Sequence, residues 1–492
     1  MKMFFKTITL AMITTLLHIP AHAAASNIYI AASSAGAADG SSCANSRATS
    51  FFNTAGNWGG GGSQIGAGTT VHLCGTISTS TVGATILTFH GSGTSGNPIT
   101  LKWEAGAVVQ AVAGGALING NSNSYLVFDG NSTSPSITET ANGSGLAYQL
   151  DGAAIDVSSC TGCELENLTI TNIFAHLQNA DTGGRGNGNC IYANNGSGLL
   201  IHNNSIDQCY VGINLVTTGI TPTQDQIYSN TIDHINWGVY FNNGGSTTIP
   251  GPLVHDNTIV NMNNWDDNVN DSYHHDGLFV VNNGTGYIQN TMLYNNSFTG
   301  TMSNCVNSCA TAWIFFNTGI TNLSIFNNVL LNGGGPMVEG CIAAGRAPQA
   351  LDSGINITNN TFITTYGLYN ITGCNGLAIE NNIYGGSIGG SALYISQITG
   401  TYAMDYNVYQ NFSSGEPHSL NVSSLMLDGS YHPSAGSPVI GKGTNLTSLG
   451  IGQLDLDKAG VIRSTAWDVG AYQYSTGAVA PLPPTNLSAT VH

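Results

Sequence analysis

Apolar and polar residues alternate in short stretches along most of this chain, with the period of two that is typical of β-strands. Stretches such as Gly238-Val239-Tyr240-Phe241 are rich in β-branched and aromatic residues, and Gly, Asn and Asp separate them. Beyond the first 23 residues, no stretch has a convincing 3.6-residue amphipathic period. The pattern therefore predicts an all-β protein.

A second pattern recurs over a longer distance. It is an apolar-x-Asn-Asn-x-apolar motif that varies at its first Asn, and Leu165-Glu166-Asn167-Leu168 is an early, partial copy. Its second Asn is Asn204, Asn230, Asn257, Asn296, Asn328, Asn360 and Asn382. The spacings are 26, 27, 39, 32, 32 and 22 residues, and such a period with variable insertions is typical of a solenoid.

A unit of about 22 residues or more, with two or three short strands and no helix, predicts one turn of a parallel β-helix. We expect the recurrent Asn to lie in a buried turn, where its amide bonds the Asn of the next coil and satisfies polar groups there. We expect an N-terminal cap with the first strands (24–98), the β-helix (99–400), C-terminal coils with a cap (401–474) and a Pro-rich tail (475–492).

Another strand recurs once in each coil, and its alternation sorts its residues into two rows. The inward row is predicted to be Ile155, Ile191, Ile213, Val239, Leu278 and Ile314. The outward row is predicted to be Asp156, Tyr192, Asn214, Tyr240, Phe279 and Phe315. Two interpretations of an exposed aromatic row stay open, namely stacking between coils and a platform for sugar rings.

Charge is scarce in this chain. Asp, Glu, Lys and Arg make up 7% of the residues, against roughly 25% in an average domain. Nine Lys and Arg face 26 Asp and Glu, for a net charge of −17, and no basic patch is present to neutralise phosphates. We therefore expect no nucleic-acid partner, and the 41% of hydrophobic residues excludes disorder.

The N-terminus predicts export. A basic start, an apolar run over 7–17 and Ala21-His22-Ala23 together indicate a secretory signal peptide over residues 1–23. No other apolar run reaches about 18 residues, so we expect no membrane span. With the signal peptide, we expect a secreted (extracellular or periplasmic) location. We also expect a monomer. Ten cysteines in an exported chain favour disulfides, and sequence proximity suggests the pairs Cys43–Cys74, Cys160–Cys163, Cys190–Cys209, Cys305–Cys309 and Cys341–Cys374.

Several segments resemble one superfamily of known proteins. The Asn-Asn-x-Ile coils, the stretches 93–104 and 125–130, and the ending 437–443 with 467–472 resemble pectate lyase-like proteins over roughly residues 27–474. The resemblance implies a right-handed parallel β-helix solenoid with an N-terminal cap and a short C-terminal tail. It does not fix the function, because the superfamily holds lyases, hydrolases, epimerases and non-catalytic surface proteins. Its lyases commonly use Lys or Arg, often with Ca²⁺.

Three long connections (176–189, 261–276 and 300–312) precede the outward row and predict a cleft there. Residues 266–276 stand out, because they hold four Asp and two His in a chain nearly free of charge. A solvated loop remains one interpretation of this segment. The predicted substrate-binding residues are Tyr192, Asn214, Trp237, Tyr240, Phe279 and Arg346.

Three chemistries stay open for this cleft. Asp267 and Asp276 are candidates for the acid and base of glycoside hydrolysis. His274 or His275 is a candidate general base. Asp266, Asp267 and Asp271 are candidate Ca²⁺ ligands, so Ca²⁺ is the candidate cofactor.

A lyase also needs a cation to neutralise the carboxylate of a uronate, and Arg185 and Arg346 are the candidates. No Lys lies between Lys102 and Lys442, which argues against a Lys-dependent lyase. We therefore expect an extracellular carbohydrate-active protein with a polysaccharide substrate, either a glycoside hydrolase or a Ca²⁺-assisted lyase. The alternative is a non-catalytic glycan-binding or structural surface protein.

Overall fold

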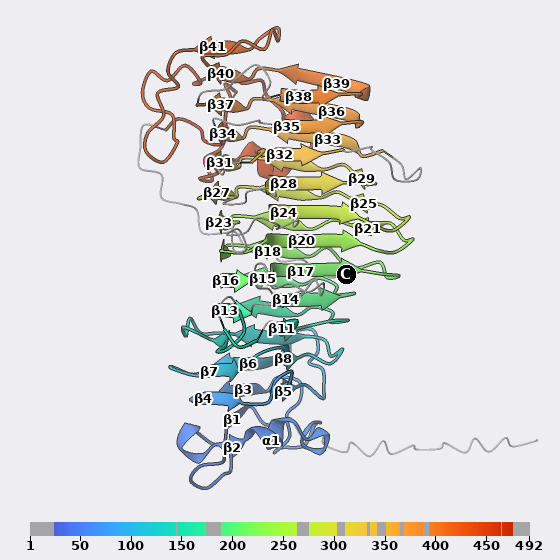
Figure 1. Cartoon of the computed structure of the whole chain (residues 1–492), viewed down its shortest axis with the longest axis vertical. Coiled ribbons are helices and arrows are strands. Elements are labelled where there is room, and N and C mark those ends of the chain that lie inside the picture. Colours follow the sequence, from blue (N-terminus) through green and yellow to red (C-terminus); the bar gives the residue numbers. More distant parts are fainter. Residues whose placement is uncertain are drawn as a thin grey trace, which may run out of the picture.

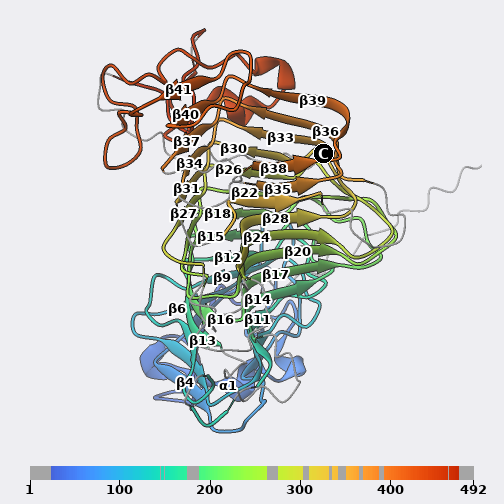
Figure 2. The same ribbon diagram turned by 45° about the horizontal axis from the view of Figure 1, so that its top comes forward.

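The computed structural model describes residues 24–475, apart from 144–145, 149, 174–187, 263–274, 303–309, 332–334, 342–350, 365–368, 387–392 and 464. Within this part of the chain, parallel strands stack into three long sheets, and each coil contributes strands to all three in turn (Figures 1 and 2). The protein is therefore a right-handed parallel β-helix, as the repeat and the resemblance predicted.

The 17-stranded sheet contains β1 (Asn27–Ala31), β2 (Arg47–Ala48), β3 (Thr70–Leu73), β6 (Ile99–Trp103), β9 (Leu126–Asp129), β12 (Glu164–Glu166), β15 (Leu200–His202), β18 (Gln226–Tyr228), β21 (Ile249–Pro250), β22 (Leu253–His255), β25 (Ile288–Gln289), β26 (Met292–Tyr294), β29 (Ile320–Thr321), β30 (Ser324–Phe326), β33 (Ser353–Thr358), β36 (Asn375–Glu380) and β39 (Thr399–Asp405).

The 13-stranded sheet contains β4 (Thr76–Thr79), β7 (Val108–Ala111), β10 (Ile137–Glu139), β13 (Thr169–Ile173), β16 (Ser205–Cys209), β19 (Thr231–Asp233), β23 (Thr258–Val260), β27 (Ser297–Thr299), β31 (Val329–Leu331), β34 (Thr361–Ile363), β37 (Ile383–Gly385), β40 (Val408–Gln410) and β41 (Leu420–Val422).

The 11-stranded sheet contains β5 (Leu87–Thr88), β8 (Gly115–Asn119), β11 (Gly152–Asp156), β14 (Gly188–Asn194), β17 (Val211–Thr217), β20 (Trp237–Asn243), β24 (His275–Asn282), β28 (Ala310–Asn317), β32 (Val338–Gly340), β35 (Tyr369–Thr372) and β38 (Leu393–Ser396).

The core lies between the three sheets and consists of stacked apolar rows. The predicted inward row of the 11-stranded sheet is confirmed, because its six residues pair in register from β11 to β28 and are at most 2% exposed. Ile201 and Ile227 pair in the same way in the 17-stranded sheet. Each coil thus buries its apolar side chains against the coils before and after it.

The predicted Asn ladder is confirmed, and it lies in the turn between the 17-stranded and 13-stranded sheets. Asn296 shows the pattern, because its Oδ1 accepts bonds from Asn257 N–H (3.1 Å) and Asn257 Nδ2 (3.0 Å). Its Nδ2 donates to Asn328 Oδ1 (3.1 Å) and to the carbonyl of Val254 (2.9 Å). The fully buried amide is therefore satisfied on both sides.

The ladder extends one step beyond the predicted set. Asn382 Nδ2 donates to Asn407 Oδ1 (3.1 Å), and Asn407 Nδ2 donates to Glu416 Oε2 (2.9 Å), which ends the series. At the other end, the backbone N–H of Leu168 donates to Asn204 Oδ1 (3.0 Å). Eight Asn side chains thus run in one continuous chain of hydrogen bonds.

The first Asn of the motif has a different role. Asn203, Asn295, Asn327, Asn359 and Asn381 have φ between 51° and 58°, in the left-handed region that Asn tolerates better than most residues. Ser229 and Asp256 take this position in two coils, with φ of 55° and 54°. The motif therefore combines a turn-forming residue with a ladder residue.

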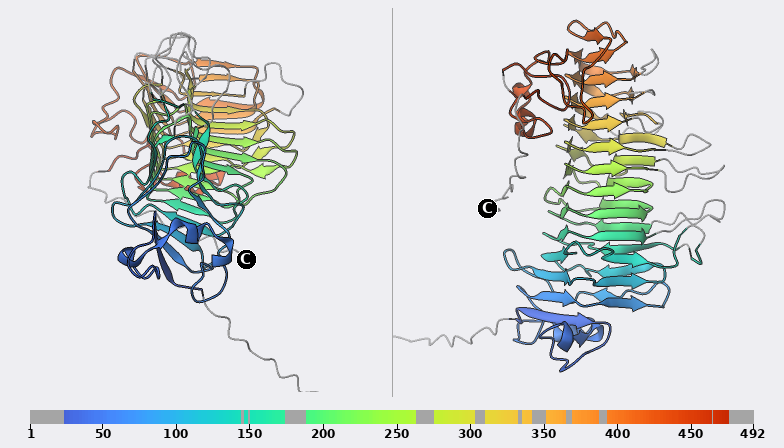
Figure 3. Two further views of the ribbon diagram at one scale, coloured as in Figure 1. Left: turned by 60° about the horizontal axis from the view of Figure 1, so that its bottom comes forward. Right: turned by 90° about the vertical axis from the view of Figure 1, so that its left-hand side faces the viewer.

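The two ends of the solenoid are covered differently. At the N-terminus, α1 (Thr49–Phe52) and two short 3₁₀ helices, η1 (Cys43–Asn45) and η2 (Ala55–Asn57), lie across the first coil (Figure 1). At the C-terminus, the segment 440–475, with η3 (Thr447–Leu449) and η4 (Gly452–Asp455), folds back beside the upper coils (Figure 3, right). Its Leu446, Leu454 and Trp467 pack on Tyr294 and Phe326 of the 17-stranded sheet.

Four of the five predicted disulfides are confirmed: Cys43–Cys74, Cys160–Cys163, Cys190–Cys209 and Cys341–Cys374. The pair Cys305–Cys309 and the signal peptide over residues 1–23 lie outside the described residues. In the described part of the chain, no helix is long and apolar enough to cross a membrane.

Candidate functional site

The predicted outward row runs along the outside of the 11-stranded sheet. Asp156, Tyr192, Asn214, Tyr240, Phe279 and Phe315 pair in register on consecutive strands from β11 to β28. Neighbouring residues of the row are therefore one strand spacing apart, about 4.8 Å. The alternation read from the sequence placed all six side chains on the correct face.

The row is not exposed along its whole length, which corrects the prediction of an exposed stripe. Phe279 is 7% exposed and Phe315 is 9% exposed, with ring centroids 5.0 Å apart. Phe279 also lies edge-on to Trp237, at 5.2 Å. Phe279, predicted to bind substrate, is therefore part of an apolar cluster outside the sheet, and stacking between coils is the better interpretation for both Phe rings.

The accessible members of the row are Asp156 on β11, Tyr192 on β14 and Tyr240 on β20. Tyr192, Trp237 and Tyr240 are half-buried, and the Trp237 and Tyr240 rings stack at 5.1 Å. Between the two tyrosines, the buried Asn214 donates from Nδ2 to Asn189 Oδ1 (2.8 Å). Packing holds these side chains in place on a continuous sheet, so they form a rigid surface with polar tips.

Of the segment 266–276, which holds the four Asp and two His, the structure describes only the last two residues. His275 and Asp276 begin β24 and are fully buried, and Asp276 pairs in register with Trp237. The other predicted residues of the cleft lie outside the described residues: Arg185, Asp266, Asp267, Asp271, His274 and Arg346. The structure thus brings Asp276 next to the aromatic surface, at the end of the connection 261–276.

A second group of polar residues, which the sequence analysis missed, lies on the outside of the 17-stranded sheet. A row of side chains pairs in register there from β3 to β18: His72, Lys102, Asp129, Glu166, His202 and Tyr228. Glu164 lies on the same face of β12, two residues before Glu166. In a chain with 7% charged residues, this is a dense cluster.

The cluster contains one ion pair and one imidazole–carboxylate contact. Lys102 Nζ bonds Asp129 Oδ2 at 2.8 Å, and His202 Nε2 bonds Glu164 Oε1 at 2.8 Å. The donor atoms of Glu164, Glu166 and His202 all lie within 4.8 Å of one another. The His202 side chain is 7% exposed and its ring stacks on Tyr228 at 4.6 Å.

Burial and like charge shape the electrostatics of this cluster. Burial, and then the neighbouring Glu164 and Asp129, raise the pKa of the Glu166 carboxyl. Burial alone would raise the pKa of Asp129, but hydrogen bonds from Lys102, Asn131 and Asn167 outweigh it and hold that pKa below its usual value. Glu166 is therefore the least compensated carboxylate of the group.

The repeat already contained the signal for this cluster. Glu166 and His202 both occupy the position just before the first Asn of the motif, and the same position holds Tyr228, His255 and Tyr294 in later coils. Because the coils stack in register, these side chains must be neighbours. Alignment of the copies at every position, and not only at the Asn residues, would have found it.

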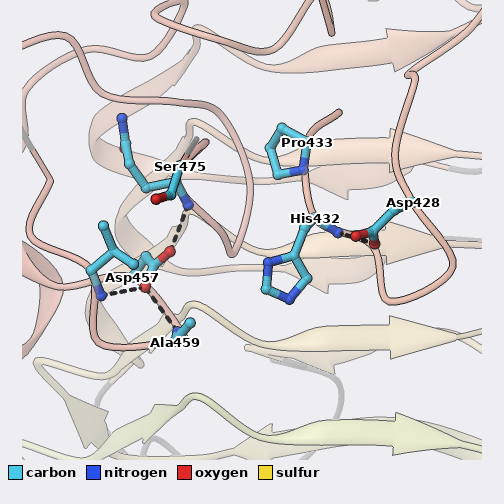
Figure 4. Close-up of a pocket in the computed structure, with 8 residues that line it drawn as sticks. Asp428, His432, Pro433, Asp457, Ala459 and Ser475 are labelled. Atoms are coloured by element: carbon cyan, nitrogen blue, oxygen red, sulfur yellow. Dashed lines mark hydrogen bonds between the residues drawn. The ribbon is translucent and has the colours of Figure 1, made fainter. Parts of the chain in front are cut away.

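A small pocket of about 200 Å³ lies between the loop 428–433 and the C-terminal segment, and it includes Asp428, His432 and Asp457 (Figure 4). Asp457 accepts backbone N–H bonds from Ala459 and Val461 at 2.8 and 2.7 Å. His432 stacks on Tyr472 at 3.7 Å. The Asp457 carboxylate is thus used to hold the backbone of its own loop. The pocket is also smaller than a typical ligand site, so we do not assign the function to it.

No protein-family model matches the sequence, and no curated protein matches it. Among solved structures, the pectate lyase Pel9A shares 16% identity over 92% of this chain and 98% of its own, with a TM-score of 0.44. The GH136 lacto-N-biosidase from Eubacterium ramulus shares 13% identity over 80% of this chain and 68% of its own, with a TM-score of 0.48. The xylose complex of XylC shares 9% identity over 81% and 86% of the two chains, with a TM-score of 0.46.

The strand pairing and the Asn ladder define the class: the chain is a right-handed parallel β-helix protein with a rigid aromatic surface on one face and a carboxylate–histidine cluster on another.

Proposed function

We propose that this protein acts outside the cell on a polysaccharide, which it binds across the outer face of the 11-stranded sheet. The observation that carries the proposal is the aromatic surface of Tyr192 on β14 and of Trp237 and Tyr240 on β20, which are half-buried and held by the strand pairing through β17. Flat rings with polar tips suit sugar rings, which have apolar faces and hydroxyl edges. Two strand spacings separate Tyr192 from Tyr240, about 10 Å, which spans more than one sugar unit.

We further propose that the protein cleaves this polysaccharide, as a glycoside hydrolase or as a Ca²⁺-assisted lyase. Residues 266–276, which end next to Trp237, supply carboxylates and imidazoles, and we assign contact with the substrate to Asp267 and His274. Arg185 and Arg346 are the proposed cations for a uronate carboxylate. Asp266, Asp267 and Asp271 supply the oxygen ligands that Ca²⁺ prefers. His275 and Asp276 are fully buried, so we assign them to positioning the end of this segment.

Activity on a panel of neutral and uronate polysaccharides tests the proposal. New reducing ends without ultraviolet absorbance indicate hydrolysis, whereas absorbance from unsaturated uronates that requires Ca²⁺ indicates a lyase. Asp267→Asn and His274→Ala should each lower kcat at least about a hundredfold, because general acid–base catalysis contributes 10²–10⁴-fold.

The aromatic surface is tested separately by Tyr192→Ala and Tyr240→Ala. Each should raise KM about tenfold, since loss of one well-packed aromatic contact costs on the order of 1.4 kcal/mol. Tyr402→Ala is the matched control, because Tyr402 is 49% exposed on β39 of the 17-stranded sheet, away from the aromatic surface. This variant should leave KM unchanged.

Binding without cleavage would favour the non-catalytic alternative, a glycan-binding or structural surface protein. In that case the two tyrosine variants should still weaken retention on the polysaccharide. If the protein neither binds nor cleaves any member of the panel, the proposed function is wrong.

A further inference from the structure

We propose that Glu164, Glu166 and His202 bind one divalent metal ion of the zinc type, on the outer face of the 17-stranded sheet. The donor atoms of these three side chains lie within 4.8 Å of one another. They belong to a different sheet from the aromatic surface, so this site is separate from the proposed polysaccharide face.

The backbone fixes the arrangement of the three donors. Glu164 and Glu166 are two residues apart on β12, so both side chains leave the same face. β15 pairs with β12 in parallel and places His202 opposite Glu166. The intervening Leu165 and Ile201 are fully buried in the core and anchor both strands. A metal ion would therefore find its ligands on rigid neighbouring strands, which keeps the cost of organising the site low.

The His202 imidazole is oriented as metal ligands usually are. Its ring stacks on Tyr228, Nε2 faces Glu164, and Nδ1 lies 3.0 Å from the Asn203 amide. In metal sites the second ring nitrogen commonly donates to a polar partner, which fixes the tautomer. If the Asn203 amide turns by half a turn, its Oδ1 can accept a hydrogen bond from Nδ1–H of His202. The neutral imidazole then carries its one proton on Nδ1, and the lone pair of Nε2 is free to bind the metal.

Charge favours a cation at this position. Lys102 compensates Asp129, whereas Glu164 and Glu166 share one imidazole between them. A divalent ion would balance both carboxylates. Zn²⁺ bonds N and O ligands at about 2.0–2.2 Å, which puts the donor atoms roughly 3.4 Å apart in a tetrahedron. His202 Nε2 and Glu164 Oε1 are now 2.8 Å apart, and all three donor atoms lie within 4.8 Å of one another, so shifts of about 1 Å would give the tetrahedral spacing. The Glu164 side chain is one third exposed and has room to move.

The donor set selects the class of metal. An imidazole nitrogen with two carboxylates suits Zn²⁺ and related transition-metal ions, whereas Ca²⁺ and Mg²⁺ take oxygen ligands. Three protein ligands leave the fourth position of a tetrahedral ion to water. The proposed ion also ties two consecutive coils together, because its ligands come from β12 and β15.

Titration of the full-length, chelator-stripped protein at pH 7.5 with Zn²⁺, against a competing fluorescent zinc indicator, tests the proposal. We expect one ion per chain with a Kd in the micromolar range or tighter, and no competition from Ca²⁺ at a hundredfold excess. His202→Gln and Glu166→Gln should each weaken Zn²⁺ binding at least thirtyfold, as loss of a ligand costs at least as much as loss of a supporting partner.

The matched control is His255→Gln. His255 lies in the same outer row, stacks on the other side of Tyr228 and bonds Asp256, and its loss should leave Zn²⁺ affinity unchanged. Lys102→Met gives a change in the opposite direction, because it removes a nearby positive charge and releases Asp129 as a further oxygen ligand. Affinity should rise about fivefold or more, a gain that misfolding cannot imitate.

Zn²⁺ should also raise the Tm of the wild-type protein by several degrees, but not that of His202→Gln, since an ion that binds only the folded state stabilises it. Two results would overturn the proposal: no Zn²⁺ binding by the wild-type protein below 100 μM, or affinity unchanged in both His202→Gln and Glu166→Gln.

Discussion

Asp225 is one of several buried carboxyl groups in a protein with few charged residues. Asp225 is 5% exposed, and its Oδ1 accepts a hydrogen bond from the backbone N–H of Leu199 at 2.8 Å. Burial raises the pKa of Asp225 to about 7, although the N–H groups of Leu199 and Gly198 oppose the shift. A raised folded-state pKa means that this group's contribution to stability is fully present below its unfolded pKa near 4, and is lost as the pH rises through 7.

Asp225→Asn should remove this dependence, because the amide oxygen still accepts from Leu199 and no charge forms. Relative to wild type, the variant should gain on the order of 3 kcal/mol in unfolding free energy between pH 5 and pH 8. Tm measured across this range for both proteins is the check, with the half-exposed Asp156→Asn as control for loss of one charge. Parallel Tm profiles for wild type and Asp225→Asn would contradict the prediction.

Single residues also show how far sequence reasoning reached into the site. Alternation placed Tyr192, Asn214 and Tyr240 on one face correctly, because a strand turns every second side chain the same way. It could not show that Phe279 and Phe315 are buried on that face, because their burial depends on what packs outside the sheet. Facing outward and being accessible are different properties, and periodicity reports only the first.

The Asn ladder is the element that unites the coils. Inside it, Asn296 makes four hydrogen bonds, whereas Asn204 at its start makes fewer, because its Oδ1 accepts from the N–H of Leu168 and no Asn amide precedes it. Asn296→Ala leaves buried donors on Asn257 and a buried carbonyl on Val254 without this partner. Each such group costs about 1–3 kcal/mol, so the total loss should exceed roughly 3 kcal/mol.

Urea unfolding of Asn296→Ala and Asn204→Ala compares the two positions. We expect the larger fall in the midpoint for Asn296→Ala. Equal losses of unfolding free energy in the two variants, or a loss below about 1 kcal/mol for Asn296→Ala, would show that the hydrogen bonds of the ladder do not stabilise the turn.

The ladder could be predicted because its chemistry repeats with its residue type. Seven members were found from the sequence. The eighth, Asn407, was missed because the aromatic Tyr406 takes the first position, where the recognised copies have Asn, Ser or Asp. The cluster of Glu164, Glu166 and His202 was missed for a related reason, since its members differ in type although they share positions in the repeat. A periodic contact between unlike residues becomes visible only when the copies are aligned position by position.

At the scale of the whole molecule, the C-terminal segment is held to the coils by two cations, of which Arg463 is buried and Lys458 is half-buried. Arg463 is fully enclosed, and its Nη2 donates to Asn327 Oδ1 (2.7 Å) and the carbonyl of Gly470 (3.0 Å). Lys458 Nζ donates to the carbonyl of Asn295. Under this segment lies the apolar end of the outer row of the 17-stranded sheet, with Phe326 fully buried and Tyr294 5% exposed.

Arg463→Lys should loosen the segment, because one ammonium group cannot reach the acceptors that the planar guanidinium spans. We expect faster proteolysis within 440–475 and increased binding of a hydrophobic dye as Phe326 and Tyr294 become exposed. Lys442→Met, at an exposed position of the same segment, is the control. Equal digestion of the two variants would show that Arg463 is not what holds the segment in place.

The ladder fixes one corner of every coil, yet the chain between successive ladder residues varies from 22 to 39 residues. Length is therefore free to change in the connections between the paired strands. Evolution, or a protein engineer, can exchange or lengthen one connection without shifting the register of its neighbours, much as antibody frameworks carry variable loops. A solenoid of this kind is a display scaffold, in which each coil offers an independent position for a new binding loop.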